Sequence, residues 1–483
     1  MLIPVGEFLP DIAELDTGVA EVATNVFPGI NSYIPVKQAT AYSGIMEAAA
    51  EVCGITLAQN TAGSYLAFGG SRDKLWKLTG TTWASVGTGY HATPDQRWSF
   101  AQWGTQLLAC NLGDALQTYD LDGAGSFGAV SGSPPLARFV DVITDFVVLA
   151  GLSSDPQSIQ WSAINDETGW TAGTNLSDIQ SFPDGGQVMN FSGAAGLVIQ
   201  ERKIRQMIRS PGSPLGAFEF QEVEAAKGTI APFSVIKYGP NIAYLTEHGF
   251  WYAGEPIGEN KIDSYFLSRV DQDQLYSVLG SFDPTGPRFF WAYKTGAQSY
   301  YDEVLVYDWS LKRWSTLDVN AFSGIGGLYD MANLATAGIT LEALDALYGT
   351  LEAVPYSLDS RIWMGGRPVA AAAGANGTLA FFDGSNAAAT IETGERELIP
   401  GRRSLVINSR PLVDSSSATV QVGVRDRLAD SRTFNSTASM QTSGAVKLRK
   451  SGRYHRFRLN IPAAATWTHV QGIDVDGVPL GVR

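Results

Sequence analysis

The sequence has little of several things that would otherwise place it in a class. Among 483 residues there are 2 cysteines, Cys53 and Cys110, and both sit in apolar runs, so we expect small core residues and no disulfide framework. No apolar run is long enough for a membrane-spanning helix, and we predict no membrane span. The first residues lack a basic region followed by a continuous apolar stretch, so we also expect no signal peptide.

Positively charged residues are few for a chain of this length. Lys and Arg number 34 against 48 Asp and Glu, which gives a net charge of −14. This balance argues against a protein that holds nucleic acid by broad electrostatic attraction. The charge is also uneven, with −20 on residues 1–390 and +6 on residues 391–483, so we expect an acidic body joined to a basic tail.

Patterns for metal binding and for common catalytic reactions are missing. Neither G-x-S-x-G nor G-x-x-x-x-G-K occurs, so hydrolase and nucleotide-binding signatures fail. Two acidic pairs precede glycine as in a calcium loop but lack the last carboxylate ligand: Asp120/Asp122 and Asp474/Asp476. The four histidines are scattered, without metal-binding spacing: His91, His248, His455 and His469. We therefore assign no catalytic, cofactor-binding or metal-binding residue.

Two weaker hypotheses concern charged side chains. A pair of carboxylates in a propeller channel could act as a glycosidase pair, and four residues are candidates: Glu201, Glu247, Asp263 and Asp302. Nothing favours one of them, and solvated carboxylates on loops or strand faces are the simpler interpretation. In the basic run 201–209, Arg205 and Arg209 could touch phosphate, although a strand pair with a charged outer face is the more ordinary arrangement.

What the chain has in abundance is glycine, at 52 residues, and aromatic side chains, at 11%. Short apolar strands bounded by Gly, Pro, Asn, Asp or Ser recur along the chain and predict an all-β protein. Helical spacing is found only around 45–52 and 331–348, and we expect helices there.

A repeat selects the architecture. Apolar strands with a central aromatic are followed by a polar turn and a second aromatic, as at 75–83, 116–127 and 304–314. The preceding strands start at Tyr65, Leu107 and Phe146, which are 42 and 39 residues apart, the spacing of propeller blades. More degenerate blades are predicted at the following positions: 187–225, 233–270, 277–318 and a closing blade within 320–385, with 356–364 as a strand pair. The sequence predicts a degenerate β-propeller of about seven blades.

Composition divides the chain into three parts. We expect an N-terminal extended or docking segment at 1–50, the propeller-like body at 51–390 and a C-terminal β domain at 391–483. Residues 368–390, rich in Ala, Gly, Asn and Ser, are interpreted as a linker or long surface loop. In 451–461 apolar and polar residues alternate, which is typical of a strand with one wet face and favours a β-sandwich-like domain.

The opening segment carries a pattern that resembles the start of tail proteins from short-tailed phages: Gly-Glu-x-x-Pro-Asp, then Ala-x-Asn-Val-x-Pro, then Tyr-x-Pro. The residues are Gly6, Glu7, Pro10, Asp11, Ala23, Asn25, Val26, Pro28, Tyr33 and Pro35. The stretches 159–170 and 305–315 are similar to that family's blade strands, and 451–483, with Trp467, resembles its C-terminus. The family is the podovirus tail nozzle or hub proteins, also called packaged-DNA stabilisation proteins.

The resemblance implies a structural protein that is not an enzyme and needs no cofactor. It implies a homohexameric ring below the portal and adaptor (head–tail connector) proteins, in contact with tail spikes, fibres or a tail needle. The ring would retain packaged double-stranded DNA and pass it during ejection without sequence-specific binding. The protein would then be a virion tail component assembled in the host bacterial cytoplasm.

The charge pattern adds an expectation, and the residues leave alternatives open. We expect the acidic body to repel DNA and four arginines of the basic tail to dock on an acidic neighbour: Arg402, Arg403, Arg456 and Arg458. The alternative functions are a propeller glycosidase or depolymerase, and a glycan-binding propeller, either of them acting on host surface polysaccharide.

Overall fold

Short antiparallel strands make up most of the computed structural model, which describes residues 1–13, 15, 18–210, 216–225, 227–335, 349–350 and 368–480. Seven groups of four consecutively paired strands follow one another among these residues. The first three are blade 1, with β7 (Ile55–Gln59), β8 (Tyr65–Gly70), β9 (Lys74–Thr79) and β10 (Thr82–Thr88); blade 2, with β11 (Ser99–Trp103), β12 (Gln106–Cys110), β13 (Gln117–Asp120) and β14 (Gly128–Ala129); and blade 3, with β15 (Ala137–Ile143), β16 (Phe146–Leu152), β17 (Ser158–Trp161) and β18 (Asp178–Ser181).

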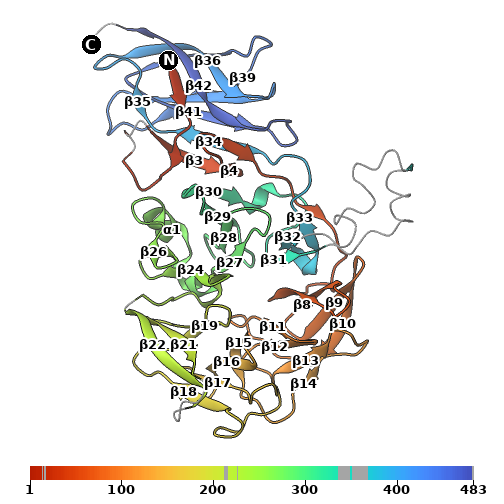
Figure 1. Cartoon of the computed structure of the whole chain (residues 1–483). Helices are drawn as coiled ribbons and strands as arrows, with labels where there is room; N and C mark the ends of the chain where they lie inside the picture. The colour runs from red at the N-terminus through yellow and green to blue at the C-terminus, as the bar shows by residue number, and fades with distance from the viewer. Residues whose placement is uncertain are drawn as a thin grey trace.

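The remaining blades continue in chain order around the ring (Figure 1). They are blade 4, with β19 (Val188–Ser192), β20 (Leu197–Gln200), β21 (Lys203–Arg209) and β22 (Phe218–Ala225); blade 5, with β23 (Ile236–Tyr238), β24 (Asn241–Thr246), β25 (Gly249–Tyr252) and β26 (Glu255–Pro256); blade 6, with β27 (Leu279–Phe282), β28 (Arg288–Tyr293), β29 (Glu303–Asp308) and β30 (Arg313–Asp318); and blade 7, with β31 (Asp330–Leu334), β32 (Val369–Ala373), β33 (Leu379–Phe381) and β6 (Thr40–Ala41).

The first strand of each blade is the innermost, and these seven strands or the residues next to them line one central cavity of about 210 Å³. The ring is closed by the chain's own beginning, because β6 pairs antiparallel with β33 as the outermost strand of blade 7. The all-β fold and the propeller predicted from the repeat are therefore confirmed. The expected blades at 187–225, 233–270 and 277–318 correspond to blades 4, 5 and 6.

Turn chemistry explains how a blade forms, as blade 6 illustrates. The apolar strands β29 and β30 pair in register from Glu303–Asp318 to Asp308–Arg313. Between them, the Asp308 carboxylate accepts hydrogen bonds from the backbone N–H groups of Ser310 and Leu311 at 3.0 and 2.9 Å, and Lys312 takes a positive φ of 56°. An aspartate that satisfies the turn backbone fixes the hairpin, and the register brings Tyr307 opposite Trp314.

Three local expectations are wrong. Residues 45–52 form no helix but a turn in which Ala49 has a φ of 61°. A segment of eight residues is too short to be a stable helix by itself, and the turn places Met46 and Val52 in the core. The start of the predicted helix 331–348 is strand β31, and residues 336–348 lie outside the described part. The predicted linker 368–390 contains β32 and β33, the two middle strands of blade 7, whose alanines at 371–373 and 380 are buried.

The predicted strand pair at 356–364 lies outside the described residues. The short helical elements that are described connect blades. They are η1 (Pro232–Ser234), α1 (Asp263–Arg269), η2 (Gln272–Ser277), η3 (Val319–Ala321) and η5 (Ala375–Gly377).

The C-terminal part forms two further layers above blade 6 in Figure 1. One sheet has the strands β4 (Val26–Pro28), β5 (Tyr33–Pro35), β42 (Val470–Pro479), β36 (Ser404–Val413) and β40 (Val446–Gly452), with β1 (Leu2–Pro4) paired to β42. The other continues from β30 of blade 6 through β3 (Val19–Thr24), β34 (Ala389–Thr393), β41 (Tyr454–Ile461), β37 (Thr419–Arg425) and β38 (Thr433–Phe434), with β2 (Glu7–Phe8), β35 (Arg396–Glu397) and β39 (Ala438–Ser439) beside it.

Residues 1–50, expected as an extended docking segment, thus contribute β1 to β5 to these two sheets and β6 to blade 7. The pairing of Leu2 with Asp474 and of Ala20 with Thr393 joins the two ends of the chain. We call this two-sheet unit, with its N-terminal strands, the C-terminal β domain.

Candidate functional site

The contact between the C-terminal β domain and blades 5 and 6, which we call the junction, is held by the N-terminal residues. Glu7 forms an ion pair with Lys261 at 2.7 Å. The Asp11 carboxylate accepts the backbone N–H groups of Ser264 and Tyr265 at 2.8 and 2.7 Å, which are otherwise unpaired donors in the first turn of α1. These bonds fix the helix that follows blade 5 to the N-terminal segment.

A second set of polar contacts fastens the same segment to β30. The Arg313 guanidinium donates to the backbone oxygen of Gly6 at 3.0 Å and lies 5.0 Å from the ring centroid of Tyr33. The Asn25 side chain donates to the backbone oxygen of Ala388 and accepts the backbone N–H of Asp318, both at 2.9 Å. One asparagine therefore connects the outer strand of blade 6 with the approach to β34.

The apolar centre of the junction belongs to both units at once. Trp314 has no exposed surface and packs against Phe250, Trp291 and Tyr307 with ring centroids 5.5, 5.8 and 4.6 Å away. The same core cluster continues through Phe8 into the apolar strands β37 and β41. Blades 5 and 6 and the C-terminal β domain consequently share one hydrophobic core.

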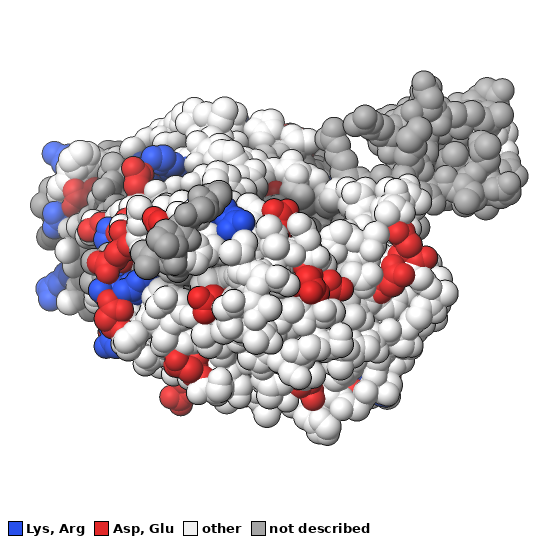
Figure 2. Space-filling model, turned by 60° about the horizontal axis from the view of Figure 1, so that its bottom comes forward, with Lys and Arg blue, Asp and Glu red and all other residues white. Residues whose placement is uncertain are grey.

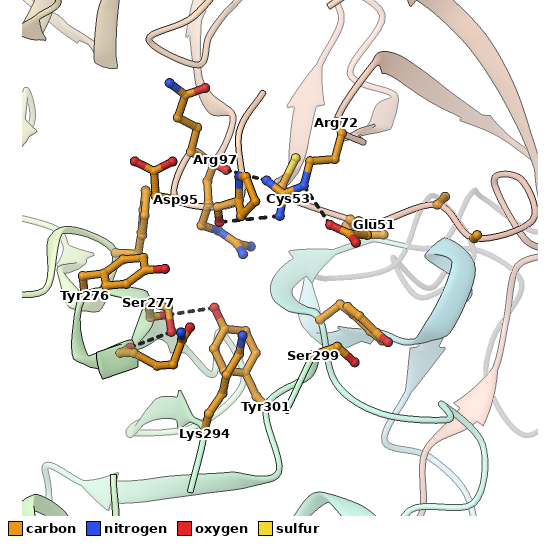
Figure 3. A pocket seen from close by; sticks show the side chains of 18 of the residues that line it. Glu51, Cys53, Arg72, Asp95, Arg97, Tyr276, Ser277, Lys294, Ser299 and Tyr301 are labelled. Atoms are coloured by element: carbon orange, nitrogen blue, oxygen red, sulfur yellow. Dashed lines mark hydrogen bonds and ion pairs between the residues drawn. The ribbon is translucent and has the colours of Figure 1, made fainter. Parts of the chain in front are cut away.

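The second feature is a cavity of about 460 Å³ at one mouth of the propeller, which we call the mouth cavity. It is lined by the segment that enters blade 1, by the segment before β11, by η1 and η2, and by the loop between β28 and β29. Figure 3 shows Lys294 and Tyr301 of blade 6 directed toward Arg72 and Arg97, which come from blade 1 and from the approach to blade 2.

Two of the three cations in the mouth cavity have carboxylate partners. Arg72 Nε lies 2.8 Å from Glu51 Oε2, and Arg97 Nη2 lies 2.8 Å from Asp330 Oδ2. Burial opposes the charge of Arg97, and the Asp330 carboxylate nevertheless holds the pKa of that guanidinium above its ordinary value. The Arg97–Asp330 pair joins the approach to blade 2 with blade 7.

The third cation, Lys294, makes no ion pair with any carboxylate of the described residues. Its Nζ lies 5.8 Å from the ring centroid of Tyr301, whose hydroxyl donates to the backbone oxygen of Ser277 at 2.7 Å. Burial first, and then the positive charges of Arg97 and Arg72, lower the pKa of Lys294. Cys53 also lines the cavity, and burial raises the pKa of its thiol to about 11, which makes it a poor nucleophile.

The four carboxylates considered as a glycosidase pair lie on separate elements and none lines the mouth cavity. Glu201 follows β20, and Glu247 is exposed between β24 and β25. Asp302 is buried and accepts the backbone N–H of Thr295 at 2.9 Å, so it shapes the loop between β28 and β29. Asp263, at the start of α1, is the one with a large pKa shift, to about 7, caused mainly by burial.

The two arginines considered for phosphate serve the structure of blade 4. Arg205 is buried, donates to both carboxylate oxygens of Asp184 at 2.7 and 2.6 Å and lies 5.1 Å from the ring centroid of Phe182. Arg209 lies 4.8 Å from the ring centroid of Phe146 and donates to the backbone oxygen of Ala217. The strand pair of the more ordinary interpretation is present as β21 and β22, but Arg205 is buried in it and does not lie on an outer face.

The residues weighed for metal binding also have local roles. Asp122 accepts the backbone N–H of Thr61 at 3.1 Å, and Asp474 lies 3.0 Å from the N-terminal ammonium group. His455 is fully buried, and burial lowers its pKa to about 4. No cluster of three or more metal-ligating side chains occurs within the described ranges. Nor does any helix in the part of the chain that the structure describes have the length and apolarity to span a membrane.

Three of the four arginines expected to dock on a neighbour have partners inside the C-terminal β domain. Arg456 is buried, with Nη2 2.6 Å from Glu392 Oε2, and Arg458 pairs with the other oxygen of the same carboxylate. Arg403 lies 3.2 Å from Asp426, and Arg402 is exposed. The excess basic charge of the tail is thus partly used to neutralise the domain's own buried acids.

The charged surface of the propeller is sparse. Figure 2 shows the side that lies lowest in Figure 1, where acidic side chains are scattered over a broad uncharged surface and most basic ones lie toward the left edge, among acidic ones. Sequence reasoning missed the mouth cavity because Arg72, Arg97 and Lys294 are far apart in the chain. The only available signal was position in the sequence: Arg97 lies two residues before the inner strand β11, and the segments that enter the inner strands meet at one mouth of the propeller.

No family model and no curated protein matches the chain. Among solved structures, the chain is similar to "YCF48 bound to D1 peptide", with a TM-score of 0.39 and 13% identity over 72% of this chain and 97% of that one. It is also similar to YCF48 from Cyanidioschyzon merolae, with a TM-score of 0.37 and 12% identity over 70% of this chain and 98% of that one.

Proposed function

We propose that the chain is a structural subunit of a phage tail, of the nozzle or hub type, that assembles into a ring, retains packaged DNA and lets it pass. The observation that carries the proposal is the junction. Several residues that carry the sequence resemblance, among them Glu7, Asp11 and Asn25, are the ones that tie the C-terminal β domain to blades 5 and 6.

A rigid connection of this kind suits a component that transmits load between neighbouring rings. β3 runs beside the outer strand of blade 6 and pairs with it at Thr24 and Thr316, which protects part of this edge from unspecific pairing. The acidic body supports weak interaction with DNA, because affinity for phosphate grows with the number of cationic contacts. In this proposal DNA passes between subunits, since the space between the inner strands is only about 210 Å³.

The decisive experiment is electron microscopy with sedimentation velocity on the purified full chain, alone and mixed with the adaptor ring of the same phage. We expect six copies in a ring, on the adaptor if not alone. The variant Asp11→Asn/Glu7→Gln should weaken ring formation by loosening the junction, whereas Asp122→Asn, a turn residue of blade 2, should leave it unchanged. A chain that stays monomeric and ignores the adaptor would overturn the proposal.

The same preparation tests the alternative functions. Incubation with capsular polysaccharide or lipopolysaccharide should yield no new reducing ends. Reproducible cleavage that is lost in Asp263→Asn or Asp302→Asn would replace the structural role by that of a depolymerase.

A further inference from the structure

The mouth cavity combines features that the proposed structural role does not use. Its volume of about 460 Å³ lies within the range of sites for small ligands. Three cationic side chains converge there, in a part of the chain whose net charge is −20. Two of them form ion pairs with Glu51 and Asp330, whereas Lys294 forms none with any carboxylate of the described residues.

An unpaired, half-buried lysine beside two guanidinium groups is unfavourable in the empty cavity. Burial and like charges both disfavour the ammonium form, and a bound carboxylate would relieve both effects. The acids around Lys294 offset these effects only in part: Asp271 and Glu51 act on it from a distance and favour its charged form, but Asp271 caps η2, Glu51 is paired with Arg72, and neither forms an ion pair with Lys294. Asp95 accepts a hydrogen bond from Thr93 on the exposed side. Such perturbed groups in a cavity are typical of binding sites.

The rest of the lining offers hydroxyl and amide groups in place of a dry apolar wall. The Tyr276 hydroxyl points into the cavity in Figure 3, and Ser299, Gln274 and Asn376 complete the polar lining. Tyr301 keeps acceptor capacity on its hydroxyl, because its proton is given to the backbone of Ser277. Groups of these types recognise the hydroxyls of a ligand in addition to its charge.

We propose that the mouth cavity binds a sugar acid, a monosaccharide unit with one carboxylate, whose carboxylate contacts Lys294 and whose hydroxyls face Tyr276, Ser299 and the amide side chains. The inference is independent of the ring assembly, because it concerns a site within one propeller. It is also independent of catalysis, since no bond is made or broken in it.

The test is calorimetric titration of the full chain with D-glucuronate, with D-glucose as the neutral match and acetate as the match without hydroxyls, all at constant ionic strength. We expect binding of glucuronate and at least tenfold weaker binding of glucose and of acetate. Lys294→Met should weaken glucuronate binding at least tenfold, and Lys294→Arg should restore part of it. Lys37→Met, the same change at an exposed site outside the cavity, should have no effect.

A second readout does not depend on a variant that folds. Reductive ¹³C-methylation of the lysines allows the titration of Lys294 to be followed by NMR, and its pKa should rise when glucuronate is added. Equal binding of acetate and glucuronate would overturn the assignment to a sugar. Absence of glucuronate binding, or unchanged binding in Lys294→Met, would overturn the site.

Discussion

The junction and the mouth cavity differ in how they use their polar and charged groups. At the junction the polar groups that hold the N-terminal segment face defined partners: Asp11 faces two backbone donors, Asn25 bridges two strands, and Arg313 donates to the backbone of the N-terminal segment. In the mouth cavity a lysine remains unpaired beside two guanidinium groups. The difference indicates that the polar groups of the junction serve to hold the fold together, whereas the mouth cavity can still bind a ligand.

The largest expected effect comes from the shared core of the junction. Trp314→Ala would leave a cavity where blades 5 and 6 meet, within the core cluster that continues into the C-terminal β domain, and should lower the free energy of unfolding by about 3–5 kcal/mol. Chemical denaturation followed by tryptophan fluorescence and by far-ultraviolet circular dichroism measures it. Trp314→Phe, which keeps most of the contacts, should cost clearly less. Two separate transitions in the wild type would contradict a shared core.

A somewhat smaller effect is expected where two arginines meet one buried acid. Glu392 is 5% exposed and faces Arg456 and Arg458. Glu392→Gln leaves Arg456 with only the more distant Glu21, at 3.9 Å, and should destabilise the protein by about 3 kcal/mol. The matched control is Glu397→Gln, since its partner Arg453 is 44% exposed and such a surface pair contributes about 0–1 kcal/mol. Equal losses in both variants would show that burial of the pair is not what matters.

These arginines also show why part of the structure could not be predicted. The blades could be predicted from the sequence, because the aromatic strands and turn residues that form each blade lie within about 40 residues of chain. The pairing of Leu2 with Asp474 and of Arg456 with Glu392 is invisible to such patterns, since the partners lie far apart in the chain. The composition of residues 369–373 predicts a linker and not the strand β32, because alanines buried in a strand have the same composition as a small-residue loop.

The mouth cavity escaped prediction for a related reason. Its residues are brought together only when the ring closes, and closure depends on β6 joining β33 across more than 300 residues of chain. Most of the fold could be predicted because blades are local, whereas the site and the junction depend on contacts between blades. The comparison between the two regions therefore has to be tested in the folded protein.

A loss of about 1 kcal/mol is expected from the cap on α1. Asp11→Ala removes the acceptor for two backbone N–H groups in the first turn, and such a loss costs about 0.5–2 kcal/mol. Hydrogen exchange should speed up in residues 263–269 and leave the strands of blades 2 and 3 unchanged. Asp271→Ala, which removes the cap of η2 instead, should leave exchange in α1 as it is. Faster exchange throughout the propeller in Asp11→Ala would show that the stabilising effect of Asp11 is not confined to α1.

The smallest and most specific effect concerns Asp263, which lies beside Asp11 in the same region. Its carboxylate accepts the backbone N–H of Phe250 at 3.2 Å, and Gly249 and Gly258 approach so closely that an added Cβ would lie 2.1 and 1.9 Å from its oxygens. Burial chiefly, with Asp11 and Glu259 nearby, raises its pKa from 3.8 to about 7. Because the folded state holds this proton more tightly than the unfolded state, Asp263 contributes stability below about pH 4 that is lost as the pH rises to about 7.

The variant Asp263→Asn keeps an acceptor for Phe250 and has no proton to lose. Its free energy of unfolding relative to the wild type should therefore increase as the pH rises from about 4 to about 7 and stay constant above that range. Denaturant titrations at several pH values measure this difference. Asp155→Asn provides a control of opposite sign, because hydrogen bonds from Ser158 and Ser181 lower the pKa of Asp155 and its contribution is lost as the pH falls. A pH-independent difference for Asp263→Asn would mean that the Asp263 carboxyl has the same pKa in the folded and the unfolded protein.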